Sequence, residues 1–160
     1  MNASPADKIL KTLEDLSRLE SSMAAYYLAC SERWKEQSSL WMDLALEEEH
    51  HENIIQNLSK VVRTHPEQFE QGLEAESTAV MSYIDNITEM TNDIRRGKVA
   101  LDEALTFALG IEESILEGRF FEIIISKNRK YLSFMKAMDS DLASHRQRIM
   151  EEIEKSRDKR

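Results

Sequence analysis

The sequence has few of the residues that interrupt helices or cross-link a chain. Its 160 residues include four glycines, two prolines and one cysteine. Because Leu, Met, Ala, Glu and Lys are common instead, the composition predicts an all-α fold. The single cysteine, Cys30, cannot form an internal disulfide, so a reducing cytoplasm is the expected location. Without a second cysteine, the chain also cannot build a thiolate site for zinc or iron on its own.

Basic residues are the minority among the charged residues. The chain has 21 Lys and Arg against 30 Asp and Glu, a formal net charge of 21 − 30 = −9. Such an acidic chain is a poor partner for nucleic acid or for an anionic membrane surface. No apolar run approaches the length of a membrane span, and the first residues lack the apolar core of a signal peptide. The length suits one domain, and we expect residues 1–160 to form it.

Apolar residues recur at alternating steps of three and four, the period of helices that pack side by side. This pattern predicts a first helix over residues 5–36 and a second over residues 38–63, with two adjacent serines as a candidate N-cap between them. One continuous helix over residues 9–62 is the alternative, because the seven-residue phase continues from Trp34 to Trp41.

The second half of the chain predicts a crossover and another hairpin. A connection over residues 64–97 contains a helix over 77–96, long enough to return along a bundle. The following hairpin, residues 98–160, has a helix that starts near residue 101 and whose apolar stripe continues to 124. A polar joint at 127–130 separates it from the last helix, which should run antiparallel to it.

Each helix of the two predicted hairpins carries an ionisable residue in the middle of its apolar stripe. Glu48 and His51 are three residues apart, which places both on one helix face. Buried polar groups are costly unless something pairs with them, and a metal ion is one such partner. Carboxylate and imidazole ligands suit iron or manganese. The alternative is a set of glutamates whose tips reach water and a hydrogen-bonded core histidine. The five candidate ligands are Glu20, Glu48, His51, Glu113 and His145.

Four segments together resemble one known family, the ferritin-like di-iron proteins, and within it the rubrerythrin-like group. The segments are LESSMAAYYLA, LALEEEHHENI, RRGKVALDEALTFALGIEESILEGRFFE and DLASHRQRI, in the family's order and spacing. The resemblance implies a four-helix bundle with a long helical crossover and a site for two iron ions, with manganese or zinc as alternatives. It places the five candidate ligands on family ligand positions. Tyr27 is a candidate hydrogen-bond partner of a ligand glutamate.

The last helix departs from the family pattern. The family has a second Glu-x-x-His there, whereas Leu142 stands three residues before His145 in this chain. Asp141 is near the same face and is a candidate substitute ligand. The loss of a bridging carboxylate implies a weaker second metal position, so one ion or weakly bound ions are an alternative. We expect Glu112, the neighbour of Glu113, to point to a different face.

The resemblance implies an oxidoreductase that acts in peroxide, oxygen or iron handling. The rubredoxin-like segment with its four cysteines is missing from the sequence, so electrons would have to come from a separate donor protein. The alternative is a metal-free bundle of the same ancestry that serves as an interaction or structural module. The sequence identifies no catalytic residue beyond the candidate ligands, and it leaves open whether the chain forms a homodimer.

Overall fold

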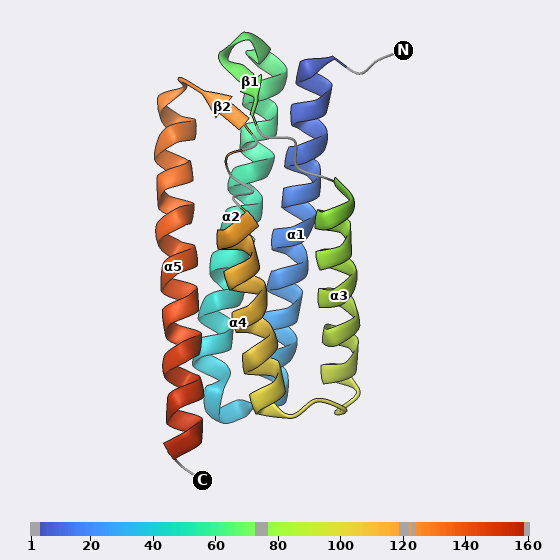
Figure 1. The fold of residues 1–160 in the computed structure, drawn as a ribbon, viewed down its shortest axis with the longest axis vertical. Helices are drawn as coiled ribbons and strands as arrows, with labels where there is room; N and C mark the ends of the chain where they lie inside the picture. Colours follow the sequence, from blue (N-terminus) through green and yellow to red (C-terminus); the bar gives the residue numbers. More distant parts are fainter. Residues whose placement is uncertain (1–3, 73–76, 119–121, 123, 159–160) are drawn as a thin grey trace.

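A computed structural model describes residues 4–72, 77–118, 122 and 124–158, and it is all-α as predicted. Figure 1 shows the helices lying alongside one another, with the chain reversing direction from each helix to the next. Two very short strands lie near one end of this group of helices. The helices are α1 (Pro5–Arg33), α2 (Ser38–Thr64), α3 (Ser77–Arg95), α4 (Leu101–Gly118) and α5 (Arg129–Asp158).

The turn between α1 and α2 differs from the prediction. The first helix ends at Arg33 because Trp34 adopts an extended conformation, with φ −115° and ψ 93°. A short 3₁₀ helix, Lys35–Gln37, then reverses the chain. The alternative of one helix over residues 9–62 is therefore wrong. The predicted serine cap is also wrong, since Ser38 is already the first helical residue and the side chain of the N-cap residue, Gln37, makes no capping hydrogen bond.

The helix predicted to begin near residue 101 does not continue to residue 124, so this part of the prediction is wrong. The helix α4 ends at Gly118, and Ile124 begins the strand β2 (Ile124–Ser126). This strand pairs antiparallel with β1 (Phe69–Gln71), which follows α2 and a second 3₁₀ turn (Pro66–Gln68). The β-branched pair Ile124 and Ile125 favours the extended conformation over the helix. Phe120, which the predicted stripe included, lies outside the described residues.

The last helix begins earlier than expected, inside the predicted polar joint. Asn128 accounts for this, since its side-chain oxygen accepts hydrogen bonds from the backbone N–H groups of Lys130 and Tyr131. These bonds satisfy donors that the first turn of a helix otherwise leaves unpaired. The crossover helix α3 agrees with its prediction, and Gly97, with φ 73°, stops it as expected.

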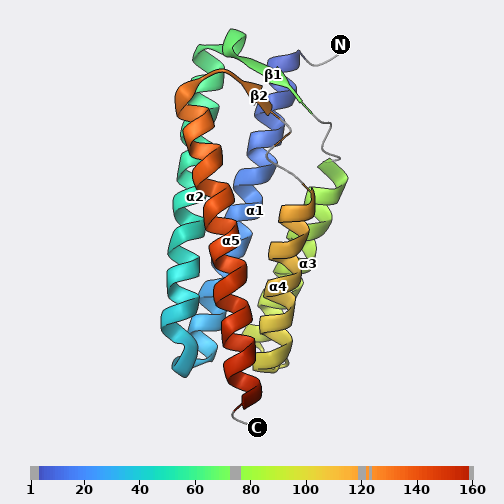
Figure 2. The same cartoon turned by 60° about the vertical axis from the view of Figure 1, so that its left-hand side comes forward.

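The helices enclose one apolar core to which all five contribute. The helix α1 packs against α2 and α3, and Figure 2 shows α5 alongside α2 on one side and α4 on the other. An aromatic cluster joins α1 to α2, because Tyr27 stacks on Trp41 with ring centroids 5.8 Å apart. Tyr26 extends it to α4 by donating a 2.7 Å hydrogen bond to the carbonyl of Ala104.

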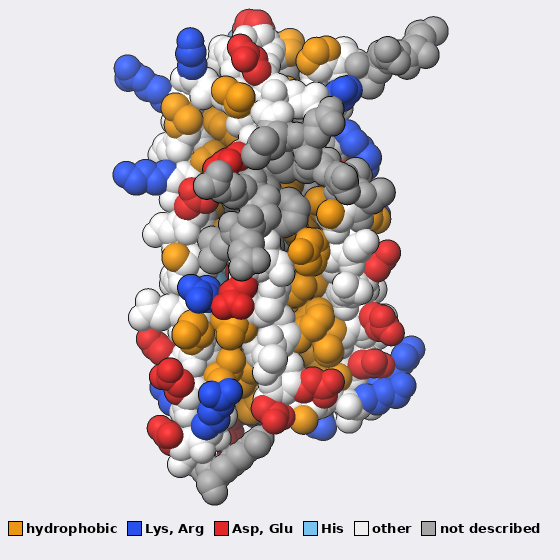
Figure 3. Space-filling model, viewed as in Figure 1, with side chains coloured by type: hydrophobic (Ala, Val, Ile, Leu, Met, Phe, Trp, Pro, Cys, Tyr) orange, Lys and Arg blue, Asp and Glu red, His pale blue; other side chains and the backbone are white. Residues whose placement is uncertain are grey.

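The face of the molecule in Figure 3 carries both charged and apolar side chains. On the face drawn in Figure 3, acidic and basic side chains lie mainly along the edges, and apolar side chains gather beside α4. Among the described helices, none combines the length and the apolar character needed to cross a membrane.

Candidate metal centre

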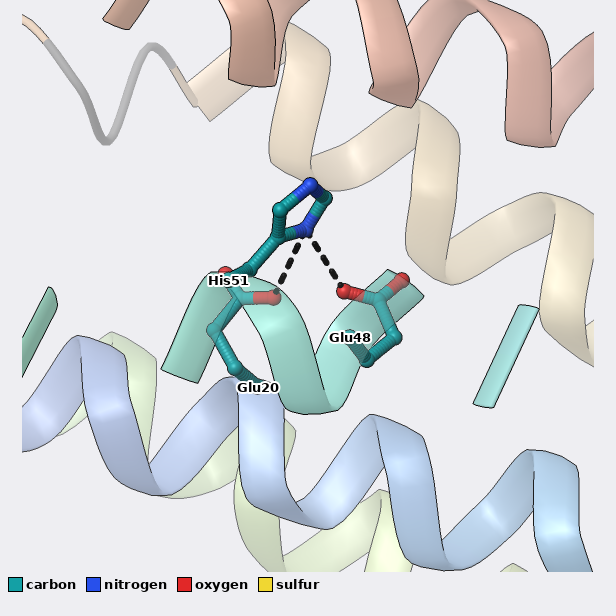
Figure 4. A group of neighbouring side chains, drawn as sticks. All are labelled: Glu20, Glu48 and His51. Atoms are coloured by element: carbon teal, nitrogen blue, oxygen red, sulfur yellow. Dashed lines mark hydrogen bonds and ion pairs between the residues drawn. The ribbon is translucent and has the colours of Figure 1, made fainter. Parts of the chain in front are cut away.

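Three of the predicted ligands meet in the core between α1 and α2. Glu20, Glu48 and His51 are each at most 4% exposed. Nδ1 of His51 lies 3.2 Å from Oε2 of Glu48 and 3.6 Å from Oε2 of Glu20, as Figure 4 shows. One ligand atom from each residue can be chosen so that all three lie within 4.8 Å of one another. The three side chains could therefore hold a single metal ion.

A second group of three shares Glu48 with the first. Oε1 of Glu48 lies 3.0 Å from Nδ1 of His145 in α5. The same nitrogen lies 3.5 Å from Oε1 of Glu112 in α4, and both Glu112 and His145 are fully buried. These three residues also offer ligand atoms within 4.8 Å of one another. Because the two oxygens of Glu48 face the two groups, this carboxylate is placed to bridge two cations.

The structure brings Glu112 to the cluster in place of the predicted Glu113. The side chain of Glu113 is 45% exposed, and its carboxylate forms a 3.2 Å ion pair with Arg146 on the outside of the molecule. Two consecutive steps of four from Leu105 rotate the helix about 80° away from the starting face, whereas a three and a four rotate it by only about 20°. The buried face of α4 accordingly runs through Ala108 to Glu112.

Two further carboxylates contact the outer nitrogen, Nε2, of each histidine, which is the ring nitrogen that does not face Glu48. Nε2 of His51 lies 3.0 Å from Oδ2 of Asp141, and Nε2 of His145 lies 2.6 Å from Oε2 of Glu47. Asp141 therefore contacts the side of His51 that faces away from Glu20 and Glu48, and it does not take the place of the missing bridging carboxylate. A carboxylate on the outer nitrogen fixes the ring and leaves the inner nitrogen free to bind a metal. Helical spacing alone did not distinguish this role of Glu47 from that of a solvated glutamate.

An approximate twofold relation links the two halves of the cluster. Asp141 stands four residues before His145 but contacts His51, while Glu47 stands four residues before His51 but contacts His145. Each hairpin thus supports the histidine of the other. The relation fails at one position, since Leu142 stands where the first hairpin has Glu48. Leu142 is 2% exposed, so the core is apolar at this position.

The charges of the cluster depend strongly on one another. Burial alone would lower the pKa of His51, but Glu20 and Glu48 outweigh it and raise the pKa to about 11. Burial likewise opposes the charged form of His145, yet Glu112 and Glu48 raise its pKa to about 10. For Glu48, burial favours a higher pKa, but the contacts with both histidines outweigh it and hold the pKa well below its usual range.

Burial acts against the charged forms of the other acids of the cluster. Burial, and then the charge of Glu48, raise the pKa of Glu20 well above its ordinary value. Burial also raises the pKa of Glu112. Burial and the neighbouring Glu112 raise the pKa of Tyr27, which therefore keeps its proton and donates a hydrogen bond to Oε1 of Glu112. The charged forms of Glu20 and Glu112 are therefore unfavourable in the core, and added positive charge would favour them.

The donor atoms fit a metal ion of intermediate or hard character. Within the described part of the chain, Oε2 of Glu112 is buried without a hydrogen-bond partner, and Nδ1 of His145 makes ion-pair contacts with Glu48 and Glu112 but no hydrogen bond. A cation held by Glu112 and His145 would satisfy both atoms. Three carboxylates and two imidazoles, without sulfur, suit iron, manganese or zinc. Cys30 takes no part, since burial raises the pKa of its thiol to about 12 and none of the metal-ligand groups includes it.

Comparisons with protein-family models, with curated proteins and with solved structures find no match to this chain. The resemblance to the ferritin-like proteins therefore depends on the residues and on the geometry of the cluster alone.

Proposed function

We propose that this protein is a ferritin-like, rubrerythrin-like metal protein with a site for two non-haem ions. The observation that carries the proposal is the placement of Glu48, whose two oxygens each face a separate carboxylate and imidazole group in the core. Metal sites built from inward-facing glutamates and histidines of packed helices are typical of di-iron carboxylate proteins. The proposed reaction class is an oxidoreductase that acts on peroxide or dioxygen, or in iron handling.

Each residue of the cluster has a distinct role in this proposal. Glu20 and His51 would hold one ion, Glu112 and His145 the other, and Glu48 both. When bound, a pair of ferrous ions supplies two electrons for the reduction of dioxygen or peroxide. The surrounding apolar core excludes bulk water from the five side chains. A cytoplasmic protein of this kind would take its electrons from a separate donor protein.

The missing fourth carboxylate lowers the capacity of the site. Three ligand carboxylates provide a charge of about −3, whereas two divalent ions bring about +4, so the filled site lacks one negative charge. Leu142 stands where a further glutamate would remove this imbalance. We therefore expect the second ion to bind more weakly than the first.

A metal-free interaction or structural module is the second candidate function. It is favoured by one observation, that the cluster partly satisfies itself. His51 lies between Glu20 and Glu48 on its inner side and Asp141 on its outer side, so its ring nitrogens have partners without a metal. In that case the buried ion pairs would fix the packing of the helices and no metal would bind.

Metal analysis of matched variants distinguishes the two functions. The purified protein is loaded with ferrous iron under anaerobic conditions, freed of excess iron and analysed for metal per chain. We expect one to two equivalents in the unaltered protein and a large loss in His51→Ala and Glu48→Ala. The neighbouring exposed residues His50 and Glu49 provide the controls, and His50→Ala and Glu49→Ala should retain the metal. A protein that binds no iron, manganese or zinc would be the metal-free module.

A further inference from the structure

Arg148, which is not a candidate ligand, contacts one half of the cluster and has no counterpart among the described residues in the other half. Nη2 of Arg148 in α5 donates a hydrogen bond to Oε2 of Glu47. The same oxygen lies 2.6 Å from Nε2 of His145. One oxygen of Glu47 therefore contacts both the guanidinium of Arg148, which is always charged, and Nε2 of the candidate ligand His145. The side chain of Arg148 is only 28% exposed, and its Nε is buried without a hydrogen-bond partner among the described residues.

Among the described residues, the other half of the cluster has no corresponding cation. Arg148 stands three residues after His145, and the residue three after His51 is the uncharged, half-buried Ile54. In the part of the chain that the structure describes, Asp141 forms its ion pair with His51, and no lysine or arginine pairs with that carboxylate. Asp141 thus acts on His51 alone, whereas Glu47 acts on His145 in competition with a guanidinium.

This difference affects how well each histidine binds a metal. A carboxylate on the outer nitrogen makes an imidazole a stronger ligand, and such partners typically change metal affinity by about 10- to 100-fold. A guanidinium on the same carboxylate oxygen withdraws part of that effect. Its positive charge also repels a cation bound at Nδ1 of His145, and partial burial limits the screening of this repulsion. Both effects weaken the position formed by Glu112 and His145.

We propose that Arg148 is a positioning and tuning residue that makes the two metal positions unequal, so that a divalent ion fills the Glu20–His51 position before the Glu112–His145 position. This inference rests on the proposed metal-binding function. The inference adds the order in which the two metal positions fill, and it assigns this order to Arg148.

The test is an anaerobic titration of the full chain with Co²⁺, followed by visible absorbance and equilibrium dialysis. Two ions that share Glu48 repel each other, so two unequal steps alone would not identify the position filled first. Glu20→Gln should weaken the first step at least tenfold, and Glu112→Gln should remove the second step and leave the first within about twofold. Circular dichroism confirms that each variant remains helical.

Variants of Arg148 test whether this residue causes the difference in affinity between the two metal positions. Arg148→Met should tighten the second step about tenfold and leave the first unchanged, and Arg148→Lys, which keeps the charge, should stay close to the original second constant. Arg146→Met is the matched control, because Arg146 pairs with Glu113 outside the cluster. Ile54→Arg places a cation at the corresponding position of the other half and should weaken the first step.

The outcomes separate the inference from the function on which it rests. Loss of the first step in Glu112→Gln overturns the proposed order. An unchanged second constant in Arg148→Met overturns the proposed role of Arg148. Either result leaves a two-metal protein. Absence of Co²⁺ binding by the unaltered chain overturns both proposals.

Discussion

Oε1 of Glu48 lies 3.0 Å from Nδ1 of His145, although the two residues come from different hairpins of the chain. The other oxygen of the same carboxylate lies 3.2 Å from Nδ1 of His51 in its own helix. This arrangement makes Glu48 the centre of the buried cluster. Its removal should therefore have a larger effect than the removal of any single neighbour, both on stability and on metal binding.

Replacement of Glu48 by alanine should destabilise the metal-free protein. The change leaves two buried histidines without their shared carboxylate, and the loss of one partner from a buried ion pair costs about 3 kcal/mol or more. Urea unfolding in the presence of a chelator measures this difference. Glu49→Ala, an exposed change one position further along the same helix, should alter the free energy of unfolding by less than about 0.5 kcal/mol. Equal stability of the two variants would contradict the buried pairing.

A carboxylate at position 142 should increase metal occupancy. Leu142→Glu would supply the fourth negative charge at the position that corresponds to Glu48. We expect the second ion to bind at least about tenfold more tightly, since an added ligand exceeds the effect of an outer-sphere partner. Metal per chain after dialysis provides the measurement. Leu142→Gln has nearly the same shape without the charge and should not show the gain, and unchanged occupancy in Leu142→Glu would argue against the alignment of α5 with the family pattern.

The metal-free protein should lose stability as the pH rises from about 6.5 to about 11. Both histidines have raised pKa values in the folded state, to about 11 for His51 and about 10 for His145. The stability that this provides is complete below the ordinary histidine pKa and is lost as the pH approaches the folded values. The raised pKa values of Glu20 and Glu112 act in the same direction above pH 4.5. Denaturant midpoints across this range, with a chelator present, test the sign.

Bound metal should reverse this trend, because a cation replaces the protons of the cluster. Metal affinity should rise over the same pH range, and binding should release protons. Calorimetric titrations in two buffers with different ionisation enthalpies count these protons. An affinity that is independent of pH would contradict the protonated state inferred for the metal-free cluster.

Cys30 should react slowly with thiol reagents in the folded protein. Its side chain is fully buried, and burial raises the pKa of its thiol to about 12. Since the thiolate is the reactive form, alkylation at pH 8 should proceed at the rate of local or global unfolding. Mass spectrometry of the folded and denatured protein gives the two rates. Similar rates would indicate that the α1 core around Cys30 opens readily.

The sequence predicted α1 and α2 and their ligands because large apolar residues mark the buried faces on both sides of each polar position. It failed on α4, where small residues occupy part of the buried face. Ala104 and Ala108 are fully buried, yet alanine contributes little to a hydrophobic pattern. With two adjacent glutamates, the choice of Leu109 in place of Ala108 as the next core residue moved the assignment from Glu112 to Glu113.

The outer carboxylates could not be assigned from helical spacing alone. Glu47 and Asp141 are each partly exposed, with side chains 41% and 46% accessible, and each reaches a histidine of the opposite hairpin. A helix pattern predicts which face a residue occupies, but it does not predict which neighbouring helix lies against the edge of that face. The short strands were missed for a related reason, since three residues give too little alternation to identify a strand.

The two short strands determine the axial alignment of α2 and α5. The strand β1 follows α2 closely and β2 directly precedes α5, and Asn128 donates a 2.7 Å hydrogen bond to the side chain of Gln68 across this junction. A slip of one residue along α5 would move its side chains by about 1.5 Å and break the contacts between His145 and α2. The pairing of these strands, outside the cluster, thus helps to fix the distances between the candidate ligands of α2 and α5.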